Sequence, residues 1–233
     1  MEFSTPLVRG RLLQRYKRFL ADIELESGEV ITAHCANPGA MTGLKEPGLS
    51  VWLSKSDNPT RKLAYSWELV ELPSGLVGIN TAHPNRLVEE AIAAGQIDQL
   101  KGYQSLRREV KYGANSRIDL LLEDPAHAPC YVEIKNVHLM RMQGLHEFPD
   151  SVTARGAKHL LELSNMVAEG NRSVMVYLIQ RDDGDRFSLA ADIDPAYAKA
   201  FNAARDCGVE AIAYCCEVSP NGINVAHQVP FVD

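Results

Sequence analysis

Two acids and a lysine stand in apolar segments of the chain, where charged side chains are uncommon. Asp119 lies within residues 116–122, and Glu133 and Lys135 lie within residues 130–136. Both segments have the apolar character of buried strands. Alternate side chains of a strand point to opposite faces, so Glu133 and Lys135 share one face. A buried charge is unfavourable unless it pairs with an opposite charge or binds a metal ion.

If the two strands are neighbours, both carboxylates can bind one divalent cation. Mg²⁺ or Mn²⁺ suits such a site, because hard cations take oxygen ligands and often use only one or two protein carboxylates. Such an ion activates water and neutralises charge on a phosphate, and Lys135 can orient or deprotonate the water. The pattern therefore predicts catalytic Asp119, Glu133 and Lys135, with Asp119 and Glu133 as metal ligands. The alternative is a buried ion pair between Lys135 and one of the acids.

The first 82 residues have the signals of a small all-β domain. Short alternating segments at 30–35, 51–53, 63–69 and 76–79 are separated by turn sequences rich in Gly, Pro and Asn. About five short strands in this length are typical of an OB-like barrel, and a five-stranded sandwich is the alternative.

Residues 83–233 have a mixed pattern of helices and strands, which predicts an α/β domain with a mixed sheet. A helix is expected from Asn85 to about Ala94, and a long helix over 152–169 is expected to be capped by Asp150 or Ser151. The other predicted elements are strands at 106–112, 117–123, 130–137, 173–180 and 209–218, and a helix at 194–207.

The order of these elements, with Asp119 followed by Glu133-Ile134-Lys135, resembles the PD-(D/E)xK nuclease superfamily. Four longer blocks make the chain similar to the bacterial sugar fermentation stimulation protein A family; they are residues 15–21, 37–41, 116–119 and 148–159. The resemblance implies an N-terminal OB-like domain, a C-terminal nuclease-like domain, DNA binding and an effect on sugar-utilisation genes. It also implies a further acid on the helix before the first strand, for which Glu90 is the candidate ligand; Glu89 and Glu109 are alternatives.

Two basic segments are candidate nucleic-acid contacts. Basic residues alternate with aromatic residues in the first segment, a pattern that barrels use to bind single strands. In the second, basic side chains stand at the start of a helix, where free N–H groups also favour phosphate. The predicted contacts are Arg15, Tyr16, Lys17 and Arg18, and then Arg155, Lys158 and His159. In each segment the alternative is structural: core aromatics in the first, and a Lys158–Glu162 surface pair in the second.

Composition and charge limit the class of protein. The 233 residues carry 24 Lys/Arg and 30 Asp/Glu, a net charge of −6, which excludes a protein that coats nucleic acid generally. Residues 1–82 carry nine bases and nine acids, so the excess of acid lies in residues 83–233. No apolar run is long enough to cross a membrane and no secretory signal is present, so a cytoplasmic location is expected. The His and Cys residues have no closed four-ligand spacing, so no zinc is expected.

The sequence thus favours a DNA-binding protein with a metal-dependent phosphodiesterase site. A regulatory DNA-binding protein that uses a nuclease-like fold without cleavage is the alternative. A sugar-binding barrel is a third hypothesis, but no cluster of aromatic and carboxamide residues supports it. The strand preference and the oligomeric state are not specified by the sequence.

Overall fold

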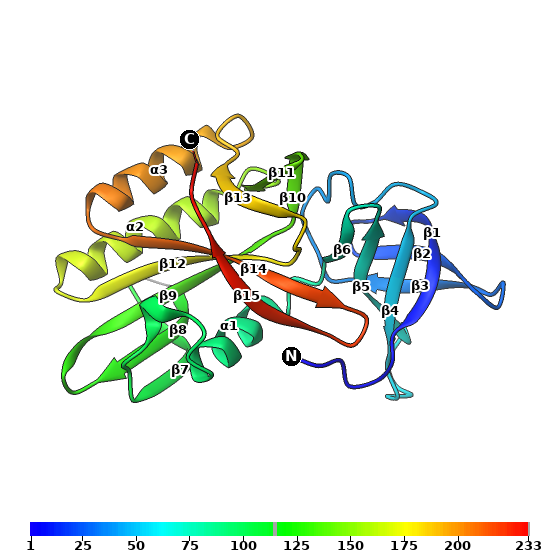
Figure 1. Cartoon of the computed structure of the whole chain (residues 1–233), viewed down its shortest axis with the longest axis horizontal. Helices are drawn as coiled ribbons and strands as arrows, with labels where there is room; N and C mark the ends of the chain where they lie inside the picture. The colour runs from blue at the N-terminus through cyan, green and yellow to red at the C-terminus, as the bar shows by residue number, and fades with distance from the viewer. Residues whose placement is uncertain (114–115, 233) are drawn as a thin grey trace.

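The computed structural model describes residues 1–113 and 116–232 (Figure 1). The N-terminal part forms a barrel with the strand order β3-β2-β1-β4-β5, and a parallel pairing between β3 and β5 closes it. Trp67, Leu12 and Ile23 are fully buried in its core. The predicted OB-like barrel is confirmed, and the sandwich alternative is wrong. The strands are β1 (Val8–Tyr16), β2 (Leu20–Leu25), β3 (Val30–Cys35), β4 (Ser50–Lys55), β5 (Tyr65–Leu72) and β6 (Gly75–Gly78), which pairs with β5 outside the closed part.

The basic segment near the N-terminus forms a hairpin, which the hydrophobic pattern did not reveal. The β1–β2 turn places Lys17 and Arg18 at φ 47° and 66°, a backbone region that residues other than glycine seldom adopt. Arg15 stabilises this turn, because its Nη2 donates to the carbonyl oxygens of Arg18, Asn37 and Gly39 at 2.7 to 3.1 Å. The guanidinium of Arg15 therefore ties the hairpin to the loop that follows β3.

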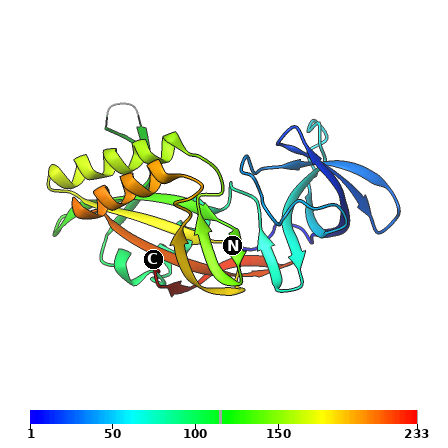
Figure 2. The same ribbon diagram turned by 90° about the horizontal axis from the view of Figure 1, so that it is seen from above.

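The C-terminal part is a six-stranded mixed sheet with helices on both faces. Its order is β15-β14-β12-β9-β8-β7, with β9, β12 and β14 parallel and the other pairings antiparallel. Helices α2 and α3 cover one face and α1 covers the other (Figure 2). The elements are α1 (Pro84–Ala93), β7 (Ser105–Tyr112), β8 (Ser116–Asp124), β9 (His127–Val137), α2 (Ala154–Ala168), β12 (Arg172–Ile179), α3 (Pro195–Asp206), β14 (Glu210–Ser219) and β15 (Gly222–Val229). The predicted mixed sheet and the order α-β-β-β-α-β are confirmed.

Several details of the predicted second domain were wrong or missed. A small sheet of β10 (Leu139–Met142), β11 (Gly144–Phe148) and β13 (Gly184–Leu189) was not predicted, and neither was β15. Helix α2 begins after Thr153, whose Oγ1 accepts a hydrogen bond from Gly156 N, so neither Asp150 nor Ser151 caps it. The buried face of α2 includes Leu163, and Leu161 is 64% exposed rather than in the core.

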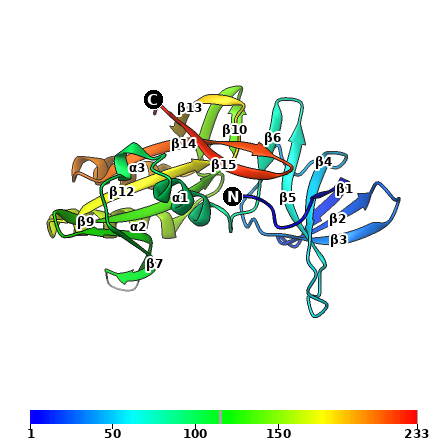
Figure 3. The same ribbon diagram turned by 60° about the horizontal axis from the view of Figure 1, so that its bottom comes forward.

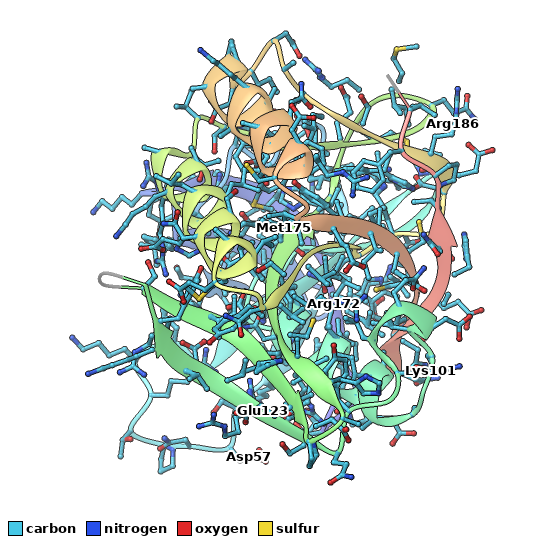
Figure 4. All side chains as sticks on the ribbon, turned by 90° about the vertical axis from the view of Figure 1, so that its left-hand side faces the viewer. Asp57, Lys101, Glu123, Arg172, Met175 and Arg186 are labelled. Carbon is cyan, nitrogen blue, oxygen red and sulfur yellow. The ribbon has the colours of Figure 1, made fainter. Side chains whose placement is uncertain are left out.

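Side chains on both faces of the large sheet pack against the helices that cover those faces. Figure 4 shows Met175 of β12 among the side chains between the sheet and the helices, whereas Glu123, Lys101 and Arg186 lie at the periphery. Within the described ranges, no helix has the length and apolar character needed to cross a bilayer.

A chain of polar contacts joins the two domains. Gly78 N donates to Gln180 O, and Gln180 Nε2 donates to Asn80 O at 3.2 Å and to Asn136 Oδ1 at 2.6 Å. Asn136 Nδ2 contacts His138 Nδ1 at 3.0 Å, which leaves the ring proton on Nε2. Strand β6, which ends at Gly78, also lies beside the β14–β15 hairpin (Figure 3).

This series of polar contacts ends at Asp150, which contacts the barrel directly. His138 Nε2 lies 3.3 Å from Asp150 Oδ2, and the same oxygen accepts a hydrogen bond from Met41 N. Gly39 packs so closely against Asp150 that a Cβ there would collide with the carboxylate. Burial opposes ionisation, but His138 and Met41 N outweigh it and lower the pKa of Asp150 to about 2. The ionised carboxylate of Asp150 is therefore a structural contact between the domains.

Replacing Asp150 with asparagine is expected to lower the free energy of unfolding by on the order of 2 kcal/mol at neutral pH. The folded pKa is below the unfolded one, so the stabilisation is present above about pH 4 and is lost as the pH falls through about 2. Denaturant titrations across this range should show the gap between the natural protein and the variant closing at low pH. Asp57→Asn, at an exposed loop, is the control and should change stability by less than about 0.5 kcal/mol. A gap that does not depend on pH would contradict this assignment.

Candidate active site

The site begins where strands β8 and β9 diverge. Their backbone pairing reaches Leu120 and Val132 and stops short of Asp119. The side chain of Asp119 replaces the missing ladder partner, because its Oδ2 accepts a hydrogen bond from Ile134 N at 2.7 Å. Its Oδ1 accepts from Asn85 Nδ2 at 2.9 Å, at the start of α1. Asp119 is thus fixed beside β9 and remains partly exposed.

Glu133 lies on β9 and faces α2, and its two carboxylate oxygens differ in their contacts. Oε1 accepts a hydrogen bond from Lys135 Nζ at 2.6 Å and another from His159 Nδ1. Oε2 is buried and has no hydrogen-bond partner among residues 1–113 and 116–232. A buried carboxylate oxygen without a partner is unfavourable, so a ligand at Oε2 would stabilise the site.

Helix α2 holds His159 in one tautomer. Arg155, one turn earlier, donates from Nε to His159 Nε2 at 3.2 Å. The ring nitrogen that accepts this bond carries no proton, so the proton is on Nδ1 and points to Glu133. The relay Arg155–His159–Glu133 orients the carboxylate, much as outer partners orient metal ligands in other proteins.

The two acids have opposite electrostatic environments. For Glu133, burial opposes ionisation, but His159 and Lys135 outweigh it and hold the pKa below its usual range. For Asp119, burial and the negative charge of Glu133 raise the pKa, against the hydrogen bonds from Ile134 N and Asn85. Such repulsion between neighbouring carboxylates favours a cation at the site.

The structure therefore brings Asp119, Glu133 and Lys135 together on adjacent strands, and it contains the ion pair between Lys135 and Glu133 that was the alternative. The catalytic and metal-binding roles of the three residues stay predictions. Within the described ranges, no three His, Cys, Asp or Glu side chains form a ready-made metal cage. Two carboxylates suffice for Mg²⁺, which retains waters and takes further oxygens from a bound phosphate.

Other predicted ligands lie elsewhere. Glu90 is turned away from Asp119 and pairs with the amino group of Met1 at 2.9 Å and with Arg86 at 2.7 Å. The prediction that Glu90 binds the metal was wrong, because the N-terminal segment packs beside α1 and supplies a positive charge. Glu89 pairs with Arg108 at 3.4 Å, and Glu109 is exposed.

The predicted nucleic-acid contacts of α2 fall into two groups in the structure, exposed residues and a buried one. Arg155 and Lys158 are exposed and line a shallow cavity of about 330 Å³ together with Arg117. His159 is buried against Glu133, so the prediction that it contacts phosphate was wrong. Gly156 gives room to Tyr197 of α3 rather than to a DNA backbone.

In the β1–β2 hairpin, Lys17 and Arg18 are exposed as expected. Arg15 is occupied by three backbone carbonyls, and Tyr16 is half-buried with its hydroxyl on Asp22. The predicted phosphate and stacking roles of Arg15 and Tyr16 are therefore replaced by structural ones. Phe19, 46% exposed, is the aromatic side chain of this segment that faces solvent.

Three neighbours of the site, Asn85, Glu162 and Tyr112, were not predicted. Asn85 Nδ2 donates to Asp119, and His83 is the residue that precedes α1. Glu162 of α2 is buried with neither oxygen hydrogen-bonded to a residue that the structure describes, and Lys158 Nζ lies 3.6 Å from its Oε1. Burial and the charges of Glu133, Glu162 and Asp119 raise the pKa of Tyr112 well above its ordinary value, so its hydroxyl is neutral. The only available signal was the polarity of these residues at apolar positions.

Comparison with known families identifies the chain. Residues 13–79 match the SfsA N-terminal OB domain, and residues 82–222 match the sugar fermentation stimulation protein RE domain. The chain belongs to the sugar fermentation stimulation protein family. The family resemblance predicted from the sequence is thereby confirmed.

Relatives match over nearly the whole length. The sugar fermentation stimulation protein homolog of Rhodospirillum centenum is 61% identical over 97% of both chains. The homolog of Maricaulis maris is 59% identical over 96% of this chain and 95% of its own. The structure of Pyrococcus furiosus SfsA in complex with Ca²⁺ has a TM-score of 0.89 and 25% identity, and covers 100% of this chain and 98% of its own.

Proposed function

We propose that this protein is a divalent-metal-dependent phosphodiesterase that acts on DNA, with Asp119 and Glu133 as the metal ligands. The observation that carries the proposal is Glu133 Oε2, which is buried and unpartnered while Oε1 is saturated by Lys135 and His159. The raised pKa of Asp119 adds support, because burial and then repulsion by Glu133 raise it, and a bound cation would offset both effects.

The donor set fits a hard cation. Both ligands are carboxylates on rigid strands, and neither the nitrogen nor the sulfur ligands of a zinc site are present among them. The Pyrococcus furiosus relative, solved in complex with Ca²⁺, is consistent with a cation that prefers oxygen. Bound Mg²⁺ or Mn²⁺ would supply an activated water and neutralise charge on the scissile phosphate.

Lys135 is placed to act on the attacking water. Its side chain is 15% exposed and its Nζ donates to Glu133 Oε1, so the lysine is fixed beside the proposed ligands and partly accessible. From there it can orient the water and take part in proton transfer. His159 and Arg155 contribute by holding Glu133 in its orientation.

Arg155 and Lys158 provide positive charge next to the acid pair, where a phosphate would arrive. Lys158 is half-exposed, and among the described residues its ion pair is the long one with Glu162, at 3.6 Å. The Lys158→Gln variant is therefore expected to bind DNA several-fold more weakly. The slope of log K against log salt should fall by about 0.7 to 0.9, the value for one lost phosphate contact. Fluorescence anisotropy over a salt series measures both quantities, and an unchanged slope would show that Lys158 does not contact DNA.

Cleavage assays test the proposal. The purified protein should cleave labelled DNA with Mg²⁺ or Mn²⁺, and EDTA should abolish the activity. DNA binding without cleavage under any of these metals would instead favour a regulatory protein that uses the nuclease-like fold only to bind. Binding that does not depend on salt would contradict both functions, because phosphate contacts dominate affinity for DNA.

A further inference from the structure

A cleft between the two domains is a feature that the metal site does not account for. It has a volume of about 600 Å³. Its barrel side is formed by Arg18 and the loop 37–40, and its other side by Asn136, His138 and the segment 148–153. Clefts of this size accommodate small organic groups, such as a nucleotide, rather than a whole macromolecule.

The polar contacts that join the domains fix the width of this cleft. Asn136, His138 and Asp150 belong both to its lining and to the chain that runs from Gln180 to Met41 N. Widening the cleft would break several of these contacts at once. The opening is therefore set by the fold and does not have to form around a ligand.

The lining combines apolar surface with positive charge. Val152 is 74% exposed at the cleft, and Pro38 and Pro149 add further apolar surface. Arg18 supplies a free positive charge, and its neighbour Phe19 is exposed on the same turn. The one acid of the lining, Asp150, is occupied by His138, Ser151 and Met41 N. Such a combination fits a chain with flat apolar bases and a negative backbone.

Two segments of the cleft lining lead along the chain to the proposed metal site. Thr153 precedes α2 and lies two residues before Arg155. Thr81 of the lining is four residues from Asn85, which binds Asp119. A strand held in the cleft would therefore lead towards the acid pair.

We propose that this cleft binds single-stranded DNA and selects it over duplex as the substrate of the metal site, an inference that rests on the proposed function. Unpaired bases can contact Val152 in the cleft and Phe19 on the adjoining turn with their faces, whereas the bases of a duplex are stacked on one another and hidden from such surfaces. The backbone of the strand would meet Arg18 at the cleft and Arg155 near the acids.

The test compares a fluorescein-labelled single strand with a duplex of the same length, in Ca²⁺ to prevent turnover. We expect the single strand to bind at least about tenfold more tightly. Val152→Asp places a negative charge in the cleft and is expected to weaken single-strand binding at least about fivefold, with duplex binding unchanged. Leu161→Asp is the matched control, because Leu161 is 64% exposed on α2 and does not line the cleft. It should leave both affinities unchanged.

Equal or tighter binding of the duplex would overturn the inference. A Val152→Asp variant that behaves like Leu161→Asp, with circular dichroism showing both folded, would overturn it as well. Phe19→Ala provides a second variant on the barrel and should weaken single-strand binding in the same direction. Metal-dependent cleavage with a duplex preference would refute the single-strand inference and leave the proposed function standing. Single-strand binding without cleavage under any metal would refute the proposed function alone.

Discussion

Replacing Glu133 with glutamine is expected to lower metal-dependent DNA cleavage on the order of a thousandfold, a barrier increase of about 4 kcal/mol. Glutamine keeps the shape of the side chain but removes the negative charge from Oε2, the unpartnered atom. Initial rates at saturating Mn²⁺ measure the loss, and isothermal titration with Ca²⁺ should show weakened binding of the cation. Binding of DNA to residues outside the acid pair should be retained.

The control is Glu90→Gln, on the helix that packs against the same sheet. Glu90 is 41% exposed and pairs with Arg86 at the surface and with the buried amino group of Met1. That amino group also donates to Ile223 O and Asn224 Oδ1, so it keeps partners in the variant. We expect its cleavage rate to stay within about twofold of the natural protein, since surface charges of this kind have small effects. Equal rates for Glu133→Gln and the natural protein would show that the cleavage comes from another site or from a contaminant.

Lys135→Met is expected to lower the rate by about a hundredfold to ten-thousandfold, the usual contribution of a group that takes part in proton transfer. The metal ligands stay in place, since His159 still donates to Glu133 Oε1. Ca²⁺ affinity should therefore change much less than the cleavage rate. A lysine with a purely structural role would change both quantities together. Single-turnover rates and Ca²⁺ titrations on the same preparation measure the two quantities.

Lys101→Met is the matched lysine control. Lys101 is exposed and pairs with Asp98, far along the chain from the acid pair. Its removal should leave rate and metal affinity unchanged. If Lys135→Met lowered Ca²⁺ affinity and rate equally, the lysine would act by orienting Glu133 and not on the water.

The sequence was sufficient for the architecture because alternation and turn residues are local signals. The closed barrel, the mixed sheet and α3 with its Asp194 cap follow from them. The hairpin of β1 and β2 was missed because its strand residues are interrupted by bases that point to solvent. Strands β10, β11 and β13 were missed because they are short and pair with each other only in the folded chain.

The acid–acid–lysine trio could be predicted because charges at apolar strand positions are conspicuous in any sequence. The partners of these residues could not. His159 and Asn85 come from helices 26 residues after Glu133 and 34 residues before Asp119, so their contacts depend on how α2 and α1 pack on the sheet. Glu90 was misassigned for the same reason, since the N-terminal segment that neutralises it is distant in sequence. Asp150 looked like a helix cap, but the fold uses it between domains.

A crystal structure of the protein soaked in Mn²⁺ shows whether the two carboxylates share an ion, because anomalous scattering locates the ion without reference to activity. We expect a peak at coordination distance from both Glu133 Oε2 and the carboxylate of Asp119, with Lys135 beside it. A peak at other residues, or no peak between these two carboxylates at a saturating concentration, would show that Asp119 and Glu133 are not the metal ligands.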